Sequence, residues 1–310
     1  MINDQSKKYN QNYLGNIVVK FLKGIKLSFL NEFSLYDLLK LYLGGIMKGA
    51  LTTRASSITL SFFMAIFPFV LFIIAVIPFI PVDNFRQDFF IFLDSILPPT
   101  TTDFFINNIF ETINSSDNAG LLSTTFIIAL ILMANGINSV FYGFQNSYHQ
   151  TLNRSFISQY TISFLLAIGF SIILIFSVLL SGFLNIYVIN NLEYYGLIEN
   201  SQAISGLIVI KNLLIIIMVY FATSILYYYG AKEKKYIKLF SVGAVMTTSL
   251  FIVNSYLFGL YVIKFSSYNE LYGSIGALLV LLLFIWLNAN ILLLGFELNT
   301  SINFFKNKNK

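Results

Sequence analysis

Apolar residues fill six long stretches of this chain, and polar or charged residues separate them. The last stretch is the clearest, because no charged residue occurs between Glu270 and Glu297. About 20 apolar residues in a helix are enough to cross the hydrocarbon core of a bilayer. The pattern therefore predicts an all-α polytopic membrane protein with six transmembrane helices, at about residues 57–80, 121–142, 162–188, 206–229, 239–263 and 271–294.

The residues before the first span predict a basic amphipathic segment over 1–55. Apolar residues from Val18 to Phe29 recur at helical spacing, with lysines largely on another face. Such a helix lies in the membrane interface, with its lysines near anionic head groups. Packing of this segment on the cytoplasmic face of the protein itself is an equal alternative. A second helix is expected to start at Ser34, where Asp37 completes a capping box, and to weaken at Gly44.

Two further features shape the predicted membrane domain, residues 56–299. Pro68 lies inside the first span and is expected to kink it, because proline lacks a backbone donor. The polar stretch 82–118 carries apolar residues at helical spacing on both sides of Pro98-Pro99, which predicts two short amphipathic helices. Residues 300–310 form a basic tail.

The distribution of charge predicts the orientation. An even number of spans leaves both termini on the same side of the membrane. All but three of the 19 Lys and Arg residues fall on that side, and the exceptions are Arg86, Lys211 and Lys264. Basic loops stay in the cytoplasm. We therefore expect a protein of the bacterial inner membrane with cytoplasmic N- and C-termini.

Neutral polar residues inside the spans are the candidate functional groups, because polar side chains in a bilayer face other helices or a wet cavity. They define a candidate polar groove between the second, fifth and sixth spans: Asn135, Asn138, Tyr142, Gln145, Asn254, Asn288 and Asn290. Interhelical hydrogen bonding and a substrate path both explain this pattern, and both interpretations stay open here. Small residues at Gly243 and Thr247, and at Gly273 and Ala277, indicate helix packing rather than a gate.

Charged residues are scarce inside the spans. Arg54 precedes the first span and Glu297 follows the last, on the same side of the membrane. An ion pair between them would join first span to last, but two separate interfacial charges are the commoner arrangement and are what we expect. The chain has no cysteine and a single histidine, His149, so we expect no metal, no cofactor and no enzymatic activity. General acid–base or metal chemistry on RNA would need such groups close together.

Several motifs resemble the YihY/BrkB family of bacterial inner-membrane proteins, long mislabelled as ribonuclease BN. Arg54-Ala55 followed by SITLSFFMAIFP through Pro68 resembles the first span of that family, and ANGINSVFYGFQNSYHQTLNR resembles its second. The ending is the most specific match and includes Tyr272, Gly273, Gly276, Trp286 and the Gly-Phe-Glu-Leu motif around Glu297. The sequence departs from the family at Phe296, where alanine is usual, and at Tyr229-Gly230-Ala231, which lacks a proline.

The resemblance implies six spans and a link to envelope biogenesis. Three functions from different classes are compatible with these features. We expect a transporter or lipid-handling protein whose partners are membrane lipids. The alternative is a non-transporting scaffold with envelope protein partners. A ribonuclease is the least favoured, and no nucleic-acid partner is expected.

Overall fold

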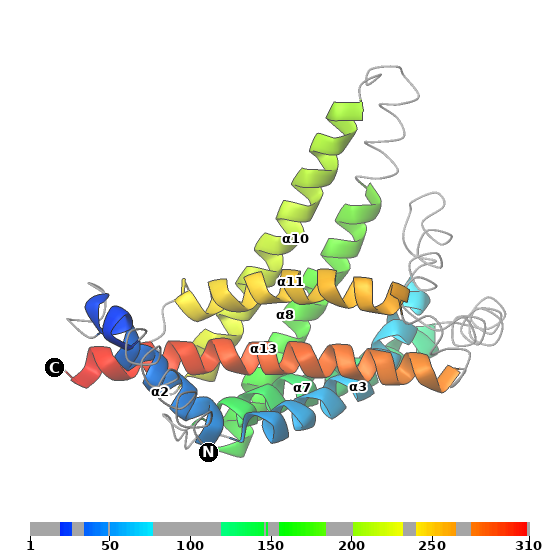
Figure 1. Cartoon of the computed structure of the whole chain (residues 1–310). Coiled ribbons are helices and arrows are strands. Elements are labelled where there is room, and N and C mark those ends of the chain that lie inside the picture. The colour runs from blue at the N-terminus through cyan, green and yellow to red at the C-terminus, as the bar shows by residue number, and fades with distance from the viewer. Residues whose placement is uncertain are drawn as a thin grey trace, which may run out of the picture.

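A computed structural model gives the arrangement of the helices (Figure 1). It describes residues 19–26, 34–48, 50–76, 119–145, 147, 155–183, 201–231, 240–264 and 274–308. Within these ranges every named element is a helix: α2 (Leu35–Lys48), α3 (Leu51–Val76), α7 (Ala119–Gln145), α8 (Phe156–Phe183), α10 (Ser201–Gly230), α11 (Val242–Lys264) and α13 (Ser274–Lys308). The predicted all-α class is confirmed.

Membrane-spanning character is clear in most of these helices. Five segments in the described part are long and apolar enough to cross a bilayer: Phe126–Gln145, Phe156–Ile173, Asn212–Gly230, Val242–Val262 and Leu278–Phe304. Helix α3 coincides with the first predicted span and has 26 residues, but it is not among the five. The protein is therefore a multi-pass membrane protein, and the number six stays a prediction.

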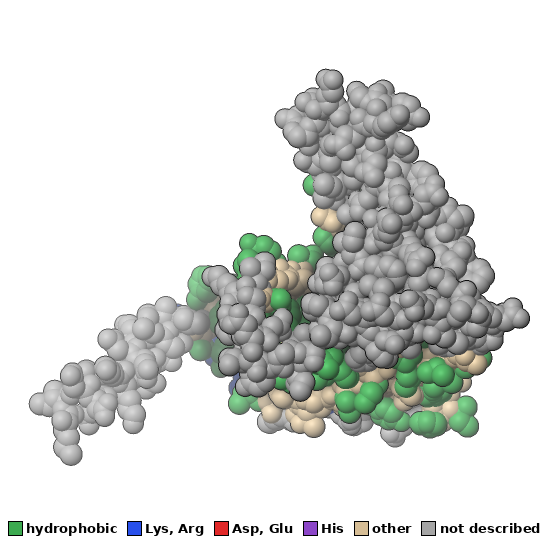
Figure 2. Space-filling model, turned by 90° about the vertical axis from the view of Figure 1, so that its right-hand side faces the viewer, with side chains coloured by type: hydrophobic (Ala, Val, Ile, Leu, Met, Phe, Trp, Pro, Cys, Tyr) green, Lys and Arg blue, Asp and Glu red, His purple; other side chains and the backbone are tan. Residues whose placement is uncertain are grey.

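Large hydrophobic side chains lie on the outside of most long helices, as expected for helices that face lipid. Exposed examples include Leu60, Ile128, Leu165, Val209 and Tyr256. Figure 2 shows hydrophobic side chains over much of the described surface that is visible from one side.

Helix packing places α3, α7 and α13 together around one core. Helix α3 packs against α7 and α13, α7 also packs against α8, and α11 packs against α13 and α10. Figure 1 shows α8 and α10 running side by side and rising from the other helices, while α2 crosses the C-terminal part of α13. The buried core contains aromatic residues from α7, α10 and α13, among them Phe141, Phe144, Tyr227 and Phe296.

Several helix limits differ from the predicted spans because local capping extends the helices. Helix α8 begins at Phe156, since Ser155 lies before it and its hydroxyl accepts from the amide of Ser158 at 3.4 Å. Helix α13 runs to Lys308 and buries Ser301 and Ile302, so no structural break follows residue 299. Likewise, the boundary predicted after residue 55 lies inside α3.

The start of α2 is confirmed as a capping box. The Asp37 amide donates to the Ser34 hydroxyl at 3.3 Å, and the Ser34 amide donates to the Asp37 carboxylate at 3.2 Å. The helix continues through Gly44 to Lys48, and a weakening at Gly44 stays a prediction. Helix α3 likewise continues through Pro68, and a kink there stays a prediction.

Some predictions fall outside the described residues. These are the amphipathic helices within 82–118, the helix limits before residue 19, His149, and the motif residues Tyr272 and Gly273. Gly276, from the same motif, is buried near the start of α13.

Candidate functional site: a buried ion pair between the first and last long helices

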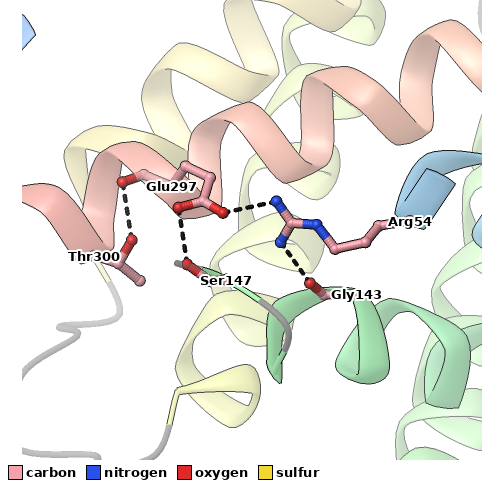
Figure 3. Close-up of polar contacts among 5 residues, drawn as sticks. All are labelled: Arg54, Gly143, Ser147, Glu297 and Thr300. Carbon is pink, nitrogen blue, oxygen red and sulfur yellow. Dashed lines mark hydrogen bonds and ion pairs between the residues drawn. The ribbon is translucent and has the colours of Figure 1, made fainter. Parts of the chain in front are cut away.

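Arg54 lies in the first turn of α3, immediately after a break between two helices. Ala50 has a positive φ of 46°, which ends the α-helical path of α2 before α3 begins at Leu51. The amide of Arg54 donates to the carbonyl of Ala50 at 3.2 Å. The break turns the chain, and the Arg54 side chain points toward α13 (Figure 3).

The guanidinium of Arg54 joins three helices. Its Nη2 donates to Oε1 of Glu297 on α13 at 2.8 Å, and its Nη1 donates to the Gly143 carbonyl on α7 at 2.8 Å (Figure 3). The carbonyls in the last turn of a helix lack intrahelical partners and carry partial negative charge. The end of α7 therefore suits a cation. Sequence analysis expected two separate interfacial charges, and this expectation is wrong because the helix packing brings the two side chains together.

The carboxylate of Glu297 is held from a second side. Its Oε2 accepts from the hydroxyl of Ser147 at 2.8 Å, and the hydroxyl of Thr300 donates to the main-chain carbonyl of Glu297 at 2.9 Å. The side chains of Arg54 and Glu297 are only 6% and 0% exposed. Buried charges are tolerated when they are paired and hydrogen-bonded, as here.

One atom of the pair has no hydrogen-bond partner among the described residues, and one tyrosine lies near the pair. The Nε of Arg54 is buried and has no hydrogen-bond partner. On α2, burial and the nearby Glu297 carboxylate raise the pKa of Tyr42 to about 12. Tyr42 is therefore neutral at physiological pH, and the negative charge at this site belongs to Glu297. The hydrogen bonds of Arg54 and Glu297 link α3, α7 and α13.

Aromatic residues adjoin the ion pair along the chain. Phe144, the residue after Gly143, stacks on Phe296, the residue before Glu297, with ring centroids 4.0 Å apart and an interplanar angle of 9°. The ring of Tyr227 meets Phe144 edge-on at 5.6 Å. The ion pair is itself buried, and hydrogen bonds are electrostatically stronger in the interior of a protein than in water. Phe296, the departure from the family pattern, is thus a core residue with its own stacking partner.

Beside this cluster, α11 approaches α13 backbone to backbone. A side chain at Gly243 would overlap the carbonyl of Gly295, and one at Gly295 would overlap the Thr247 hydroxyl. The Tyr227 hydroxyl donates to the Leu292 carbonyl at 2.7 Å and lies 2.6 Å from the Thr247 hydroxyl. The predicted packing role of Gly243 and Thr247 is confirmed.

Two of the four candidate groove residues of the second span, Asn138 and Gln145, lie between α7 and α8. Gln159 of α8 donates to Asn138 at 2.8 Å and accepts from Gln145, and both Gln159 and Asn138 are buried. Asn135 and Tyr142 are exposed and lie outside this network. Sequence analysis missed Gln159, although its polar side chain next to an apolar run is the signal that could have indicated it.

Two of the remaining candidates, Asn254 and Asn288, lie between α11 and α13, and Asn290 lies on another side of α13. Asn254 donates to Asn288 at 3.3 Å. Asn288 and Asn290 also donate to carbonyls of their own helix, those of Phe284 and Trp286, at 2.8 and 2.7 Å. The interhelical hydrogen bonds of these candidates thus form two separate sets, one between α7 and α8 and one between α11 and α13, and a single groove between the second, fifth and sixth spans stays a prediction.

A groove does open elsewhere, between α3 and α13. It has a volume of about 290 Å³ and is lined by Ser56, Thr59, Leu60, Leu282, Leu283 and Trp286. Three of these residues are leucines, and the two hydroxyl groups belong to α3. Of these residues, sequence analysis had singled out only Trp286.

The described residues include no group of three or more His, Cys, Asp or Glu side chains arranged to hold a metal ion. Polar chemistry in the described part is concentrated instead in the ion pair and in the amide and hydroxyl contacts between helices.

Comparison with known proteins agrees with the motif resemblance. The family model for virulence factor BrkB matches residues 43–310. The chain belongs to this family. A curated protein named "Putative ribonuclease-like protein YfkH", from Bacillus subtilis (strain 168), is 26% identical over 255 residues, which cover 81% of this chain and 90% of that protein.

Two other relatives carry the name UPF0761 membrane protein. One, from Aggregatibacter aphrophilus (strain NJ8700), is 24% identical and covers 80% of this chain and 85% of its own length. The other, from Haemophilus influenzae (strain 86-028NP), is 22% identical, and the match covers 80% of this chain and 88% of that protein. No solved structure matches the chain.

Proposed function

We propose that this BrkB-family membrane protein binds and moves a lipid, or a lipid-linked envelope precursor, at the groove between α3 and α13. The groove of about 290 Å³ is the observation that carries the proposal. Ligand pockets for drug-sized molecules have volumes of about 300–1,000 Å³, so this groove suits one part of a lipid rather than a whole molecule.

The lining of the groove suits an amphipathic ligand. Leu60 and Leu283 are 57% and 38% exposed and offer an apolar wall to an acyl chain. The hydroxyls of Ser56 and Thr59 donate to carbonyls of their own helix at 3.0 and 2.7 Å. Each hydroxyl oxygen can still accept a hydrogen bond from a head group. Trp286 adds an amphipathic ring, a side chain common at membrane interfaces.

A specific observation favours a second candidate function, a non-transporting scaffold for envelope assembly. Asn138, Asn254 and Asn288 are all engaged in contacts between helices. Such contacts contribute roughly 0.6 kcal/mol each in membrane proteins. The scaffold explains them without a ligand, and envelope proteins would then be the partners.

We propose no enzymatic and no nucleic-acid-binding role for the chain. The name of the Bacillus protein describes that protein alone. Hydrolysis of RNA requires an acid–base pair or metal site that reaches phosphate, and the most buried carboxylate described here, Glu297, is enclosed by Arg54 and Ser147.

Leaflet-resolved transport tests the lipid proposal. The purified chain is reconstituted into vesicles, and movement of a fluorescently head-group-labelled phosphatidylglycerol is followed with an impermeant quencher. Leu283→Trp fills the groove and should reduce the rate at least severalfold. Leu257→Trp is the matched control, since Leu257 is exposed on α11 and does not line the groove. Equal rates for both variants would exclude the groove, and no transport by the folded wild type would favour the scaffold.

A further variant separates the two sites. Asn138→Leu removes the acceptor of Gln159 between α7 and α8, and should lower stability without changing the transport rate per folded molecule. A loss of transport in folded Asn138→Leu would move the substrate path to that interface.

The same proposal places the protein in the bacterial inner membrane with both termini in the cytoplasm. The chain lacks cysteine, so single cysteines can report sidedness. Cysteines at positions 118 and 235, both outside the described residues, should react with an impermeant reagent from opposite sides. Labelling of both from one side would refute six spans.

A further inference from the structure

The outward face of α2 exposes large apolar side chains and a lysine together. The inward face of this helix packs on α13, where Leu38 and Leu41 contact Leu298 and Ile302. Lys40, Leu43 and Met47 are exposed, and Leu43 and Met47 are 53% and 85% exposed. Their spacing of three and four residues places all three on one side of the helix. That side mixes one cation with two large apolar groups.

The residues before α2 extend this face. The Leu35 amide donates to the Ile25 carbonyl at 2.9 Å, which ties the helical residues 19–24 to the start of α2. The ammonium of Lys23 lies 5.2 Å from the ring centroid of Tyr36, one turn before Lys40. Phe21 is also exposed, at 69%, but its offset of two residues from Lys23 places it on another side of this short helix. We call Lys23, Lys40, Leu43 and Met47 together the basic face.

The charge near this face is positive. Residues 19–48 contain five lysines, Lys20, Lys23, Lys26, Lys40 and Lys48, against the two acids Glu32 and Asp37. The Asp37 carboxylate accepts from the amide and hydroxyl of Ser34 in the capping box. It therefore serves the start of α2 as well as offsetting one lysine.

We propose that the basic face docks on the anionic phospholipid head groups of the leaflet that borders the start of α3. Helix α2 leads into α3 through Ala50, and it crosses α13 near the end of that helix (Figure 1). Helix α2 thus lies at the end of the bundle formed by the start of α3 and the C-terminal part of α13, and its outward face points away from α13. Each lysine near an anionic surface favours binding about fivefold, and large apolar side chains enter the boundary between head groups and acyl chains. This docking is independent of whether the groove moves lipid.

The two faces of α2 also bear on the alternatives left open by the sequence. Packing on the protein accounts for Leu38 and Leu41, but it leaves Leu43 and Met47 exposed. Contact with lipid accounts for the exposure of Leu43 and Met47. The helix thus serves as an adaptor, with one face on α13 and the other on the membrane surface.

A probe at Met47 tests the docking. Met47→Cys is labelled with an environment-sensitive fluorophore in the full chain, which has no other cysteine. The protein is placed in nanodiscs of phosphatidylcholine alone or with phosphatidylglycerol. We expect blue-shifted emission and quenching by spin-labelled lipid with phosphatidylglycerol, and weaker effects without it or at high salt.

A charge variant supplies the control. Lys20→Gln, Lys23→Gln and Lys40→Gln together remove three cations, each worth about fivefold in partition, so the preference for phosphatidylglycerol should fall on the order of a hundredfold. Circular dichroism verifies that the variant is folded. A water-like probe in both lipid compositions, or lipid quenching that is unaffected by the three substitutions, would overturn the proposal. A probe shielded from water but not quenched by lipid would also overturn it, in favour of a protein partner.

Discussion

Breaking the Arg54–Glu297 pair is the perturbation for which the structure supports the largest effect. The two side chains are 6% and 0% exposed, and their charged atoms meet at 2.8 Å. Removing one partner from a buried pair leaves the other charge uncompensated, at a cost of about 3–5 kcal/mol. In Glu297→Gln the guanidinium retains the Gly143 carbonyl, and in Arg54→Met the carboxylate retains Ser147. One neutral partner does not replace a charge, so we expect each single variant to lose most of that amount.

The double variant Arg54→Met/Glu297→Gln separates the pair energy from other effects of each substitution. It leaves neither charge buried, so it should lose much less stability than the sum of the two single variants. We expect a coupling energy of at least about 2 kcal/mol, in the range measured for buried charge pairs.

The assay is equilibrium unfolding of the purified chain in mixed micelles. Circular dichroism reports helix content, and Trp286, the single tryptophan, reports the surroundings of α13. Lys40→Gln is the control for loss of an exposed charge and should stay within about 0.5 kcal/mol of wild type. Single variants as stable as this control, or strictly additive losses, would show that the pair does not clamp α3 to α13.

Three other predictions concern packing and pH. Phe296→Ala should cost about 3–5 kcal/mol of unfolding free energy because it empties a stacked core position, whereas Phe304→Ala, at a position 44% exposed on the same helix, should cost far less. Equal losses in denaturation would contradict the core role. Gly243→Ala should destabilise by about 1–3 kcal/mol through overlap with the α13 backbone, whereas Gly259→Ala, with open space around it, should gain up to about 1 kcal/mol. A stable Gly243→Ala variant would refute the close approach. Because the pKa of Tyr42 is raised from about 10 to about 12, its contribution to stability is complete below pH 10 and is lost as pH rises to about 12. Tyr42→Phe should therefore flatten base-induced unfolding in that interval, and an unchanged pH profile would contradict the shift.

Features that depend on neighbouring residues in the chain were predictable. The capping box at Ser34 is a three-residue pattern, and it starts α2 where expected. The long helices follow from apolar runs, because the cost of placing a residue in a bilayer adds up along one segment. Their limits were less predictable, as the early start of α8 after Ser155 shows, because caps and tertiary contacts extend helices beyond their apolar centres.

The hydrogen-bond partners at the candidate site were not predictable from neighbouring residues in the chain. Asn138 and Asn254 were both identified as polar residues inside predicted spans, but they bond to different partners, Gln159 and Asn288. A sequence indicates that an amide in a span needs a partner, since an unsatisfied polar group in hydrocarbon is costly. It does not indicate which helix supplies the partner, because that depends on the order and rotation of the packed helices.

The sequence by itself determined the membrane character, the helical class and the family of this protein, since each is a property of local composition and short motifs. Only the tertiary structure decided that Arg54 meets Glu297, a residue 243 positions later in the chain. Hydropathy treats both residues alike as charges at the membrane boundary. Their contact instead depends on α3 and α13 lying side by side, with a carbonyl near the end of α7 accepting a second hydrogen bond from Arg54.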